Sequence, residues 1–400
     1  MNEHLESLTD KQASILVQFR QNVCDLLKHH HNDNFLLRWL RATKFDVKQS
    51  EALLRTHLKW REENNIDSLF TEYQPPEVMT KYCPGSFYGQ DKEGSIIWID
   101  PVGDIDIHGL LMSAKREGFV KYMIWNMEKS CQLFEVYSKE QDRRVDQVIM
   151  IYDLENLGLR HLWKPGIQAF SEVVQIFEEH YSDTIKTIYI LNAPKIFSVI
   201  FNVLKRFLRE ETVGKIKFLG ANYKEVLLQQ IDSDQLPAHW GGTCVDPDGN
   251  PRCPSKICPG GMVPKYYYLH NIAVDLSGFS EVIIPRGSSF QLDFVINDVG
   301  SALRWQFKTE GFDIRFGIFR RTKDVRQKLR DMEPIVNSKR VKCQLFLEEG
   351  SVHCTQIGTY ILRFDNAYSL VRSKKLYYLI EVLRPDEQVI PLLDNQEIGH

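Results

Sequence analysis

The 400-residue chain has little excess charge and no long hydrophobic run, and each absence excludes some classes of function. It holds 50 Lys and Arg against 53 Asp and Glu, a formal net charge of -3, so the chain as a whole does not attract nucleic acid. No uninterrupted apolar run approaches the ~18 residues of a spanning helix. The first residues, MNEHLESLTD, are acidic and lack the basic-then-apolar order of a signal peptide.

Cysteines are few and scattered, and the sequence has no Asn-x-Ser/Thr site. Both features are typical of a protein in a reducing cytosol. Cys244, Cys253 and Cys258 share one loop, but no matching Cys/His pair stands at zinc-finger spacing, so free thiols are favoured. The run from His29 to His31 is interpreted as an exposed connector rather than a metal site. We therefore expect no metal and no cofactor.

The motifs of common enzymes are also missing. The sequence has no G-x-S-x-G, no phosphate-binding loop, no G-x-G-x-x-G and no H-E-x-x-H. Asp153 and Glu155 follow an apolar strand pattern, a position where carboxylates of α/β sheets often act. No His or metal motif accompanies them, so a turn or capping role is favoured. We expect a protein that is not an enzyme, and a hydrolase using Asp153 or Glu155 is the alternative.

Two periodicities divide the first part of the chain. Residues 1–74 have apolar residues at helical spacing, as in NFLLRWLRATKFD, with capping patterns at Thr9-x-x-Gln12 and Asp46-x-x-Gln49. This predicts a helical extension. Residues 75–244 alternate short apolar runs, such as QVIMIYD and TIYILNAP, with long helical patterns. Alternation of this kind predicts an α/β layer structure with a largely parallel sheet.

The last part of the chain changes to a period of two. Residues 245–265 are dense in Pro and Gly and predict a linker. Across residues 266–384, runs such as FQLDFVI and TYILRFD alternate apolar with polar between turn signals, which predicts an antiparallel β-sandwich. Residues 385–400 are expected to be a C-terminal tail. The basic stretch at residues 319–334 is interpreted as a solvated loop, with contact to anionic lipid or an acidic partner as the alternative.

One segment, IFSVIFNVLKRFL at residues 196–208, is unusually apolar. Its polar residues, Ser198, Asn202, Lys205 and Arg206, recur at helical spacing as one narrow stripe. At ~1.5 Å per residue a helix of this length reaches roughly 20 Å and cannot cross a bilayer. A buried core helix is one interpretation. The spread of phenylalanines around the helix favours another, in which one flank covers a lipid cavity or meets a membrane surface.

These stretches together resemble a known family. FLLRWLRATKFDVKQSEALLRTHLKWR, IYDLENLGLRHLWKPG, TIYILNAPKIFSVIFNVLKRFL and LPAHWGGT resemble the CRAL-TRIO (Sec-fourteen-like) lipid-binding fold with its N-terminal helical extension. ALRWQF, FGIF and GTYILRFDNAYS resemble the GOLD domain that follows it in the supernatant protein factor and tocopherol-associated protein group. The resemblance implies an α/β lipid-binding fold followed by an all-β sandwich.

The resemblance also implies a function: non-enzymatic binding of a hydrophobic lipid and its transfer between membranes. The implied setting is the cytoplasm with transient membrane contact, and the implied partners are the lipid, a membrane surface and a protein bound through the GOLD domain, without nucleic acid. Ligands of the group are phosphatidylinositol, phosphatidylcholine, tocopherol and squalene, among which apolar pockets discriminate poorly. The alternative is a lipid-sensing adaptor that acts on a trafficking or lipid-synthesis partner.

In this family a mobile gate helix closes the lipid pocket, and here it matches Pro194 to Leu208. The implied gate residues are Phe197, Ile200, Phe201, Leu204, Phe207 and Leu208. From residue type and position, the candidate pocket residues are Tyr122, Trp125, Phe170, Phe177 and Tyr189. Each of these is equally consistent with plain core.

The phosphoinositide-binding members hold the headgroup with two basic residues and an acid. Carried over by motif, these positions are Lys44 in RATKFD, Lys215 in TVGKIKF and Asp183 in HYSDTIK. Lysines suit a phosphate and an acid suits inositol hydroxyls. The sequence departs from the family pattern at Ser182, where the family has proline, and at Asp183, where it has glutamate. A solvated surface charge is the alternative for each lysine.

Overall fold

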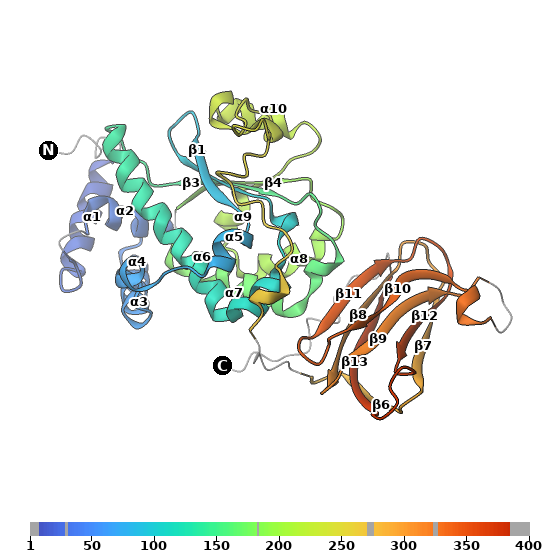
Figure 1. The fold of residues 1–400 in the computed structure, drawn as a ribbon. Coiled ribbons are helices and arrows are strands. Elements are labelled where there is room, and N and C mark those ends of the chain that lie inside the picture. Colours follow the sequence, from blue (N-terminus) through green and yellow to red (C-terminus); the bar gives the residue numbers. More distant parts are fainter. Residues whose placement is uncertain (1–7, 29–30, 182–183, 270–275, 323–326, 385–400) are drawn as a thin grey trace. The chain divides into compact units, whose positions relative to one another are not determined.

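The chain folds into two compact units, which divide between Tyr268 and Leu269 (Figure 1). The computed structural model describes residues 8–28, 31–181, 184–269, 276–322 and 327–384. Among these residues, no helix is both long and apolar enough to cross a membrane.

The first unit begins with a helical extension, as the sequence predicts. Its core consists of apolar side chains at helical spacing, among them Phe19, Leu36 and Leu54. The Thr9–Gln12 capping box is present, and Asp46 accepts a hydrogen bond from the Gln49 backbone N–H at 3.0 Å. The helices of the extension are α1 (Asp10–Asn22), α2 (Asp33–Ala42), α3 (Val47–Glu63) and the short α4 (Leu69–Glu72).

A five-stranded sheet forms the centre of the first unit, in the order β1-β2-β3-β4-β5. β1 and β2 form an antiparallel hairpin, and the remaining neighbours pair in parallel. The expectation of a largely parallel sheet is therefore confirmed. The strands are β1 (Ser86–Gln90), β2 (Ile96–Asp100), β3 (Val148–Asp153), β4 (Ile185–Leu191) and β5 (Ile216–Phe218).

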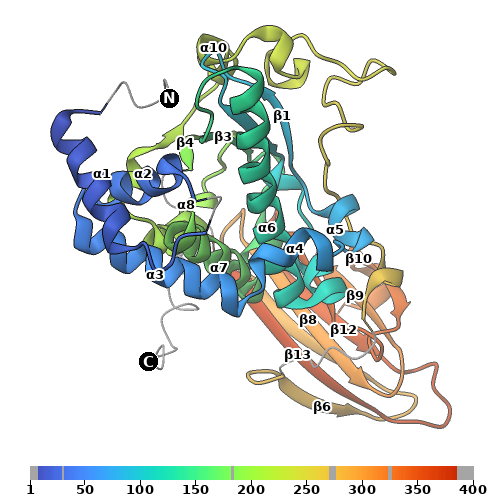
Figure 2. The same ribbon diagram turned by 90° about the vertical axis from the view of Figure 1, so that its left-hand side faces the viewer.

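Helices cover the two faces of this sheet differently (Figures 1 and 2). The long α6, together with α7 and α8, lies against one face, and α10 with the chain after it lies against the other. α6 is the longest helix of the unit, and its backbone leaves the helical conformation at Lys115 (φ 59°). The helices are α5 (Glu77–Tyr82), α6 (Ile107–Glu140), α7 (Lys164–His180), α8 (Phe197–Leu204), α9 (Glu210–Gly214) and α10 (Tyr223–Gln230).

Residues 245–265 do not form the linker that their Pro and Gly content predicts. Ile257 is buried in the core beside the sheet, and the Val263 backbone N–H donates to the Asp106 carboxylate at 2.9 Å. The Gly85 N–H donates to the Cys258 carbonyl at 3.0 Å. The segment is therefore part of the first unit, because a turn-rich chain is ordered where its apolar side chains and backbone groups find partners.

The second unit is the predicted antiparallel sandwich. Its two sheets have the orders β10-β9-β12-β7 and β11-β8-β13-β6, and every pairing is antiparallel. Inward residues such as Phe307, Phe316 and Phe364 form one core between the sheets. The strands are β6 (Ser280–Ile284), β7 (Ser289–Ile296), β8 (Ala302–Glu310), β9 (Ile314–Arg320), β10 (Glu333–Val341), β11 (Glu348–His353), β12 (Gly358–Asp365) and β13 (Lys374–Leu383).

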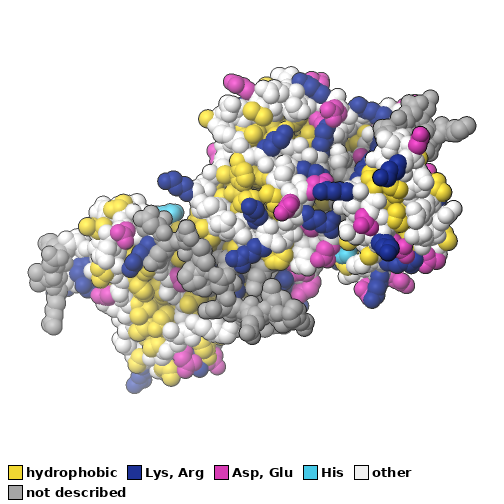
Figure 3. Space-filling view, turned by 180° about the vertical axis from the view of Figure 1, so that it is seen from behind, with side chains coloured by type: hydrophobic (Ala, Val, Ile, Leu, Met, Phe, Trp, Pro, Cys, Tyr) yellow, Lys and Arg dark blue, Asp and Glu magenta, His cyan; other side chains and the backbone are white. Residues whose placement is uncertain are grey.

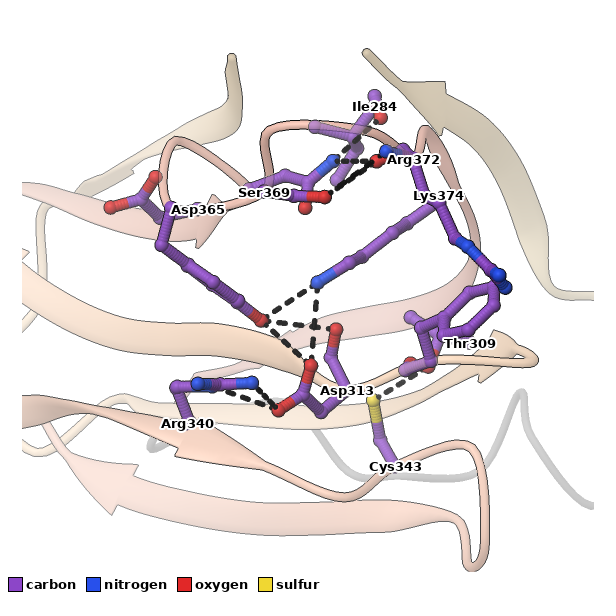
Figure 4. A network of polar contacts seen from close by, with 12 residues as sticks. Ile284, Thr309, Asp313, Arg340, Cys343, Asp365, Ser369, Arg372 and Lys374 are labelled. Carbon is purple, nitrogen blue, oxygen red and sulfur yellow. Dashed lines mark hydrogen bonds and ion pairs between the residues drawn. The ribbon is translucent and has the colours of Figure 1, made fainter. Parts of the chain in front are cut away.

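A buried polar network joins the two sheets of the sandwich (Figure 4). Asp313, next to β9, binds Arg340 of β10 at 2.8 Å and the ammonium of Lys374 of β13 at 3.4 Å. Lys374 is buried, and it also donates to the Tyr368 hydroxyl at 2.7 Å. Burial lowers the pKa of Lys374. The carboxylate of Asp313 opposes this effect, because it stabilises the charged ammonium.

Candidate functional site

An apolar cavity lies between the sheet and the helices α6, α7 and α8. It encloses about 190 Å³, and its lining is almost entirely hydrophobic. The strands contribute Met150, Ile188 and Ile190, and α7 contributes Phe170 and Phe177. These strand residues share one face because side chains alternate along a strand. An interior space with such walls suits hydrocarbon and offers little to a polar ligand.

Helix α8 forms one wall of the cavity. The side chains of Phe197, Ile200, Phe201, Leu204 and Leu208 line it, while Phe207 does not. No residue of α8 is buried, although the helix is almost wholly apolar. The stripe of Ser198, Asn202, Lys205 and Arg206 is exposed. A wall whose apolar residues are only half covered has less packing to hold it in place than the rest of the fold.

Aromatic rings extend from α8 to the edge of the sheet. The ring of Phe201 lies 5.8 Å from that of Phe197 and 5.3 Å from that of Phe218 in β5. Phe218 is 53% exposed, which is unusual for a phenylalanine in a strand. In Figure 3, hydrophobic side chains reach the surface of the first unit beside Lys and Arg side chains. The cavity wall thus continues into exposed aromatic surface.

The predicted pocket residues divide between the cavity and other parts of the core. Phe170 and Phe177 line the cavity. Tyr189 lies on the opposite face of the sheet because its neighbours Ile188 and Ile190 take the cavity face, and this prediction is corrected. Tyr122 and Trp125 stack on each other outside the cavity lining, with ring centroids 5.9 Å apart, so they are corrected as well.

The cavity contains one buried acid that sequence reasoning missed. Asp100, the last residue of β2, lines the cavity and is 6% exposed. The Trp98 indole N–H donates to its Oδ2 at 3.3 Å, and its Oδ1 has no hydrogen-bond partner among the described residues. Burial raises the pKa of this carboxyl to about 7, against the smaller opposing effect of the Trp98 bond. The sequence feature that could have identified Asp100 is an acid at the end of an otherwise apolar strand.

The predicted headgroup residues lie near a small side pocket. This pocket, about 30 Å³, is lined by Lys215, Arg209 and Ala42, and it shares Phe177 and Ile185 with the main cavity. Lys215 also pairs with Glu211 at 3.4 Å. Lys44 is exposed two residues beyond Ala42, in a left-handed backbone conformation (φ 54°). Asp183 lies outside the described residues, so the structure brings only part of this set together.

Asp153 and Glu155 are held in a structural network. Asp153 accepts hydrogen bonds from the Trp240 indole at 3.0 Å and from the Asn192 amide at 2.8 Å. Burial alone would raise the pKa of Asp153, but hydrogen bonds from His239 and these groups lower it to about 2. Glu155 pairs with Arg252 at 2.6 Å. His239 lies close enough to both acids for shared metal binding, but the acids already have protein partners.

A second, polar groove of about 1040 Å³ lies where the helical extension meets α6 and α7. Arg61 of α3 binds Glu128 of α6 at 2.8 Å, and the Tyr181 hydroxyl donates to the same carboxylate at 2.7 Å. Burial lowers the pKa of His57 to about 2 and that of His180 to about 4. Charged and polar side chains take a much larger share of these walls than of the apolar cavity, so the groove suits a hydrocarbon chain less well.

The remaining sequence features are structurally ordinary. All eight cysteines are free thiols, including Cys244, Cys253 and Cys258. In the basic stretch 319–334, β9 ends at Arg320 and β10 begins at Glu333, and the residues between them that the structure describes are partly or fully exposed. The membrane or partner contact considered for this stretch stays a prediction.

Comparison with known proteins gives three domain matches. Residues 80–242 match the CRAL/TRIO domain, residues 1–56 match the CRAL/TRIO N-terminal domain, and residues 320–382 match a GOLD domain described as Golgi-dynamics membrane-trafficking.

Similar whole proteins come from animals. Over 353 residues the chain is 29% identical to protein ctg-1 of Caenorhabditis elegans, which covers 88% of this chain and 91% of that protein. Over 411 residues it is 28% identical to protein real-time of Aedes aegypti, covering 95% of this chain but 62% of that protein. The chain thus spans about three fifths of the length of the real-time proteins. A crystal structure of Sfh5, 17% identical, covers 65% of this chain and 95% of its own chain with a TM-score of 0.48.

Proposed function

Since the chain belongs to the CRAL/TRIO proteins that also carry a GOLD domain, we propose that it transfers a hydrophobic lipid between membranes. The lipid occupies the apolar cavity, and α8 is the gate that opens on a membrane. The observation that carries this proposal is α8 itself, an apolar cavity wall without one buried residue. In the cell, such a carrier is cytoplasmic with transient membrane contact.

The size of the cavity supports a moving wall. Its volume of about 190 Å³ is below the roughly 300–1,000 Å³ of ordinary ligand pockets. A two-chain lipid therefore requires the walls to separate, and α8 is a wall without any buried residue. Outward movement of α8 enlarges the cavity without disturbing the sheet.

The energetics of lipid exchange explain why the gate opens at a membrane. Each methylene exposed to water costs about 0.8 kcal/mol, so a two-chain lipid in water alone costs on the order of 20 kcal/mol. Opening against a bilayer keeps both the acyl chains and the phenylalanines of α8 in an apolar medium. Phe218, exposed beside Phe201, extends this contact surface.

The lipid itself is proposed at the level of class. A phospholipid such as phosphatidylinositol or phosphatidylcholine, or an isoprenoid such as tocopherol or squalene, has the required apolar body. Lys215 and Arg209 at the side pocket supply positive charge for a phosphate, with Lys44 and Asp183 as further members of the headgroup site. The acids Asp153 and Glu155 are committed to structural contacts, so the proposal includes no turnover of the lipid.

Transfer of a fluorescent phosphatidylcholine between vesicles tests this function. Phe201→Asp places a charge on the cavity side of α8, and we expect the transfer rate to fall at least about tenfold, because an unpaired carboxylate in the cavity is costly. Asn202→Asp, on the exposed stripe of the same helix, adds the same charge as a control and should leave transfer within about twofold. Equal loss of transfer in both variants contradicts the gate.

Phe218→Asp separates membrane contact from lipid binding. This side chain is not part of the cavity lining, so the variant should load lipid normally but transfer it more slowly. A wild-type chain that binds lipid without transferring it favours the adaptor instead. In that case a protein partner recognises the lipid-bound chain through the GOLD domain, and the bound lipid is not delivered to a membrane.

A further inference from the structure

We propose that Asp100 recognises a hydroxyl group at the buried end of the lipid, so that the cavity selects an alcohol over a hydrocarbon of the same size. This inference rests on the proposed function, since it concerns the ligand of the same cavity. It starts from a mismatch between the Asp100 carboxyl and the almost entirely apolar lining of the cavity around it.

The surroundings of Asp100 leave half of its carboxyl unsatisfied. Trp98 donates to Oδ2, but no protein group donates to Oδ1. The next residue is Pro101, which has no backbone N–H to donate. The nearby Gly85 N–H is committed to the Cys258 carbonyl at 3.0 Å. A buried acceptor without a donor is destabilising, and a ligand that brings the donor removes that penalty.

Within the part of the chain that the structure describes, no cation compensates the carboxyl. The ionisable groups that act on it or that it acts on are the thiols of Cys83 and Cys258 and the phenol of Tyr152. Burial raises the pKa of all three, so they stay uncharged near neutral pH. The Tyr152 hydroxyl donates weakly to the Met150 sulfur at 3.4 Å rather than to Asp100.

A hydroxyl fits this position better than other polar groups. Burial holds the pKa of Asp100 at about 7, so the carboxyl exists both protonated and ionised near neutral pH. A hydroxyl both donates and accepts, and it can therefore pair with either form. An ammonium needs several acceptors after it leaves water, and a further carboxylate residue of the lining, Glu178, already lies beside Arg209 at 3.8 Å. A second carboxyl would compete with Asp100 for a single proton.

The test uses two isomers, dodecanol and methyl undecyl ether, which have the same atoms but differ in the O–H group. The full chain is equilibrated with equal amounts of both, unbound ligand is removed, and the two bound isomers are extracted and counted by gas chromatography, because their equal masses cannot be distinguished in a native mass spectrum. At about pH 8.5 we expect dodecanol to be preferred by about tenfold or more, since only the alcohol donates to the carboxylate. At about pH 5.5 the preference should shrink, because the protonated carboxyl also donates to the ether oxygen.

Two variants separate recognition from folding. Asp100→Leu should bind both isomers without preference, and Asp100→Asn, whose amide both donates and accepts, should show the reduced preference of the protonated wild type at both pH values. Equal loading of the isomers by the wild type, or an unchanged preference in Asp100→Leu, overturns the inference. Dodecane serves as the probe of the carrier itself. If dodecane loads but the alcohol has no advantage, the carrier stands and hydroxyl recognition fails, whereas a wild type that loads none of the three probes contradicts both.

Discussion

The two faces of the central sheet use the same strands for different purposes. On one face, Ile97, Ile151 and Tyr189 pack against Trp240 and the residues around α10 in a continuous core. On the other face, alternate residues of the same strands border a cavity that α8 covers. The solid face holds the unit together, and the hollow face has room for a ligand.

The difference lies in what closes each face. Trp240 is 1% exposed, and its indole N–H is fixed to Asp153 at 3.0 Å. The cover of the hollow face, α8, has neither a buried residue nor a side-chain cap at its start. The packing of α8 is therefore weaker than that around Trp240, which leaves α8 free to open without unfolding the unit.

The largest expected effect comes from breaking the solid face. Trp240→Ala removes a buried ring and leaves Asp153 without one of its donors, so we expect unfolding to become easier by about 5 kcal/mol. Phe197→Ala on α8 should cost only about 1 kcal/mol, because that side chain is only partly buried. Urea denaturation measures both values. Similar losses for the two variants contradict the proposed division between the faces.

A pH-dependent effect should come from Asp100 on the hollow face. The pKa of Asp100 is raised from 3.8 to about 7 in the folded chain, so the folded state holds its proton more tightly than the unfolded state. Stability from this group is present at low pH and is lost as pH rises from about 4 to about 7, by up to about 4 kcal/mol. Asp100→Asn removes this titration.

The lipid-free Asp100→Asn variant should therefore gain stability relative to the wild type as pH increases. Thermal unfolding at about pH 4 and about pH 8 measures the gain, and other titrating groups cancel in the difference between the chains. A constant difference across this range shows that Asp100 has an ordinary pKa.

A matched pair of insertions sharpens the comparison further. Ile151→Phe overfills the solid face and should cost about 1–3 kcal/mol. Ile190→Phe directs the same extra atoms into the cavity, so its cost should be smaller and its main result should be reduced lipid loading. Denaturation and native mass spectrometry on both variants check the two readouts. A larger loss of stability from Ile190→Phe than from Ile151→Phe would show that the free space does not lie on the cavity face of the sheet.

The smallest expected effect concerns the side pocket. Lys215→Ala should lower the loading of phosphatidylinositol relative to a neutral lipid by a few fold, since its ammonium is partly exposed and shared with Glu211. Competition between the two lipids measures this ratio, with Lys217→Ala as the control for loss of a neighbouring lysine outside the pocket lining. An unchanged ratio removes Lys215 from the headgroup site.

The sequence predicted features that depend on local pattern. The helical extension, the strand-helix alternation, the sandwich and the polar stripe of α8 all follow from periodicity, and the structure contains each of them. Periodicity fails where both sides of an element are apolar. β4 reads as one apolar run, so nothing in the run itself assigns Ile188 and Tyr189 to their faces.

Features that depend on distant contacts were beyond the sequence. Residues 245–265 have the composition of a linker, and only the burial of side chains such as Ile257 fixes them to the first unit. Tyr122 and Trp125 belong to a long, kinked helix in which several faces are buried, so residue type did not identify the cavity side. Asp100 is an ordinary acid in the sequence, and its isolation appears only in three dimensions.

The most direct test of the account is the movement of α8 at a membrane. Spin labels at Asn202 of α8 and Gln229 of α10 report the distance between the two covers, and labels at Gln175 of α7 and Gln229 form the reference pair. Labels are attached to introduced azido amino acids, because the chain has eight native cysteines. We predict that phosphatidylcholine vesicles lengthen and broaden the α8–α10 distance and leave the reference distance unchanged. Lipid transfer with no change in either distance would contradict the gate.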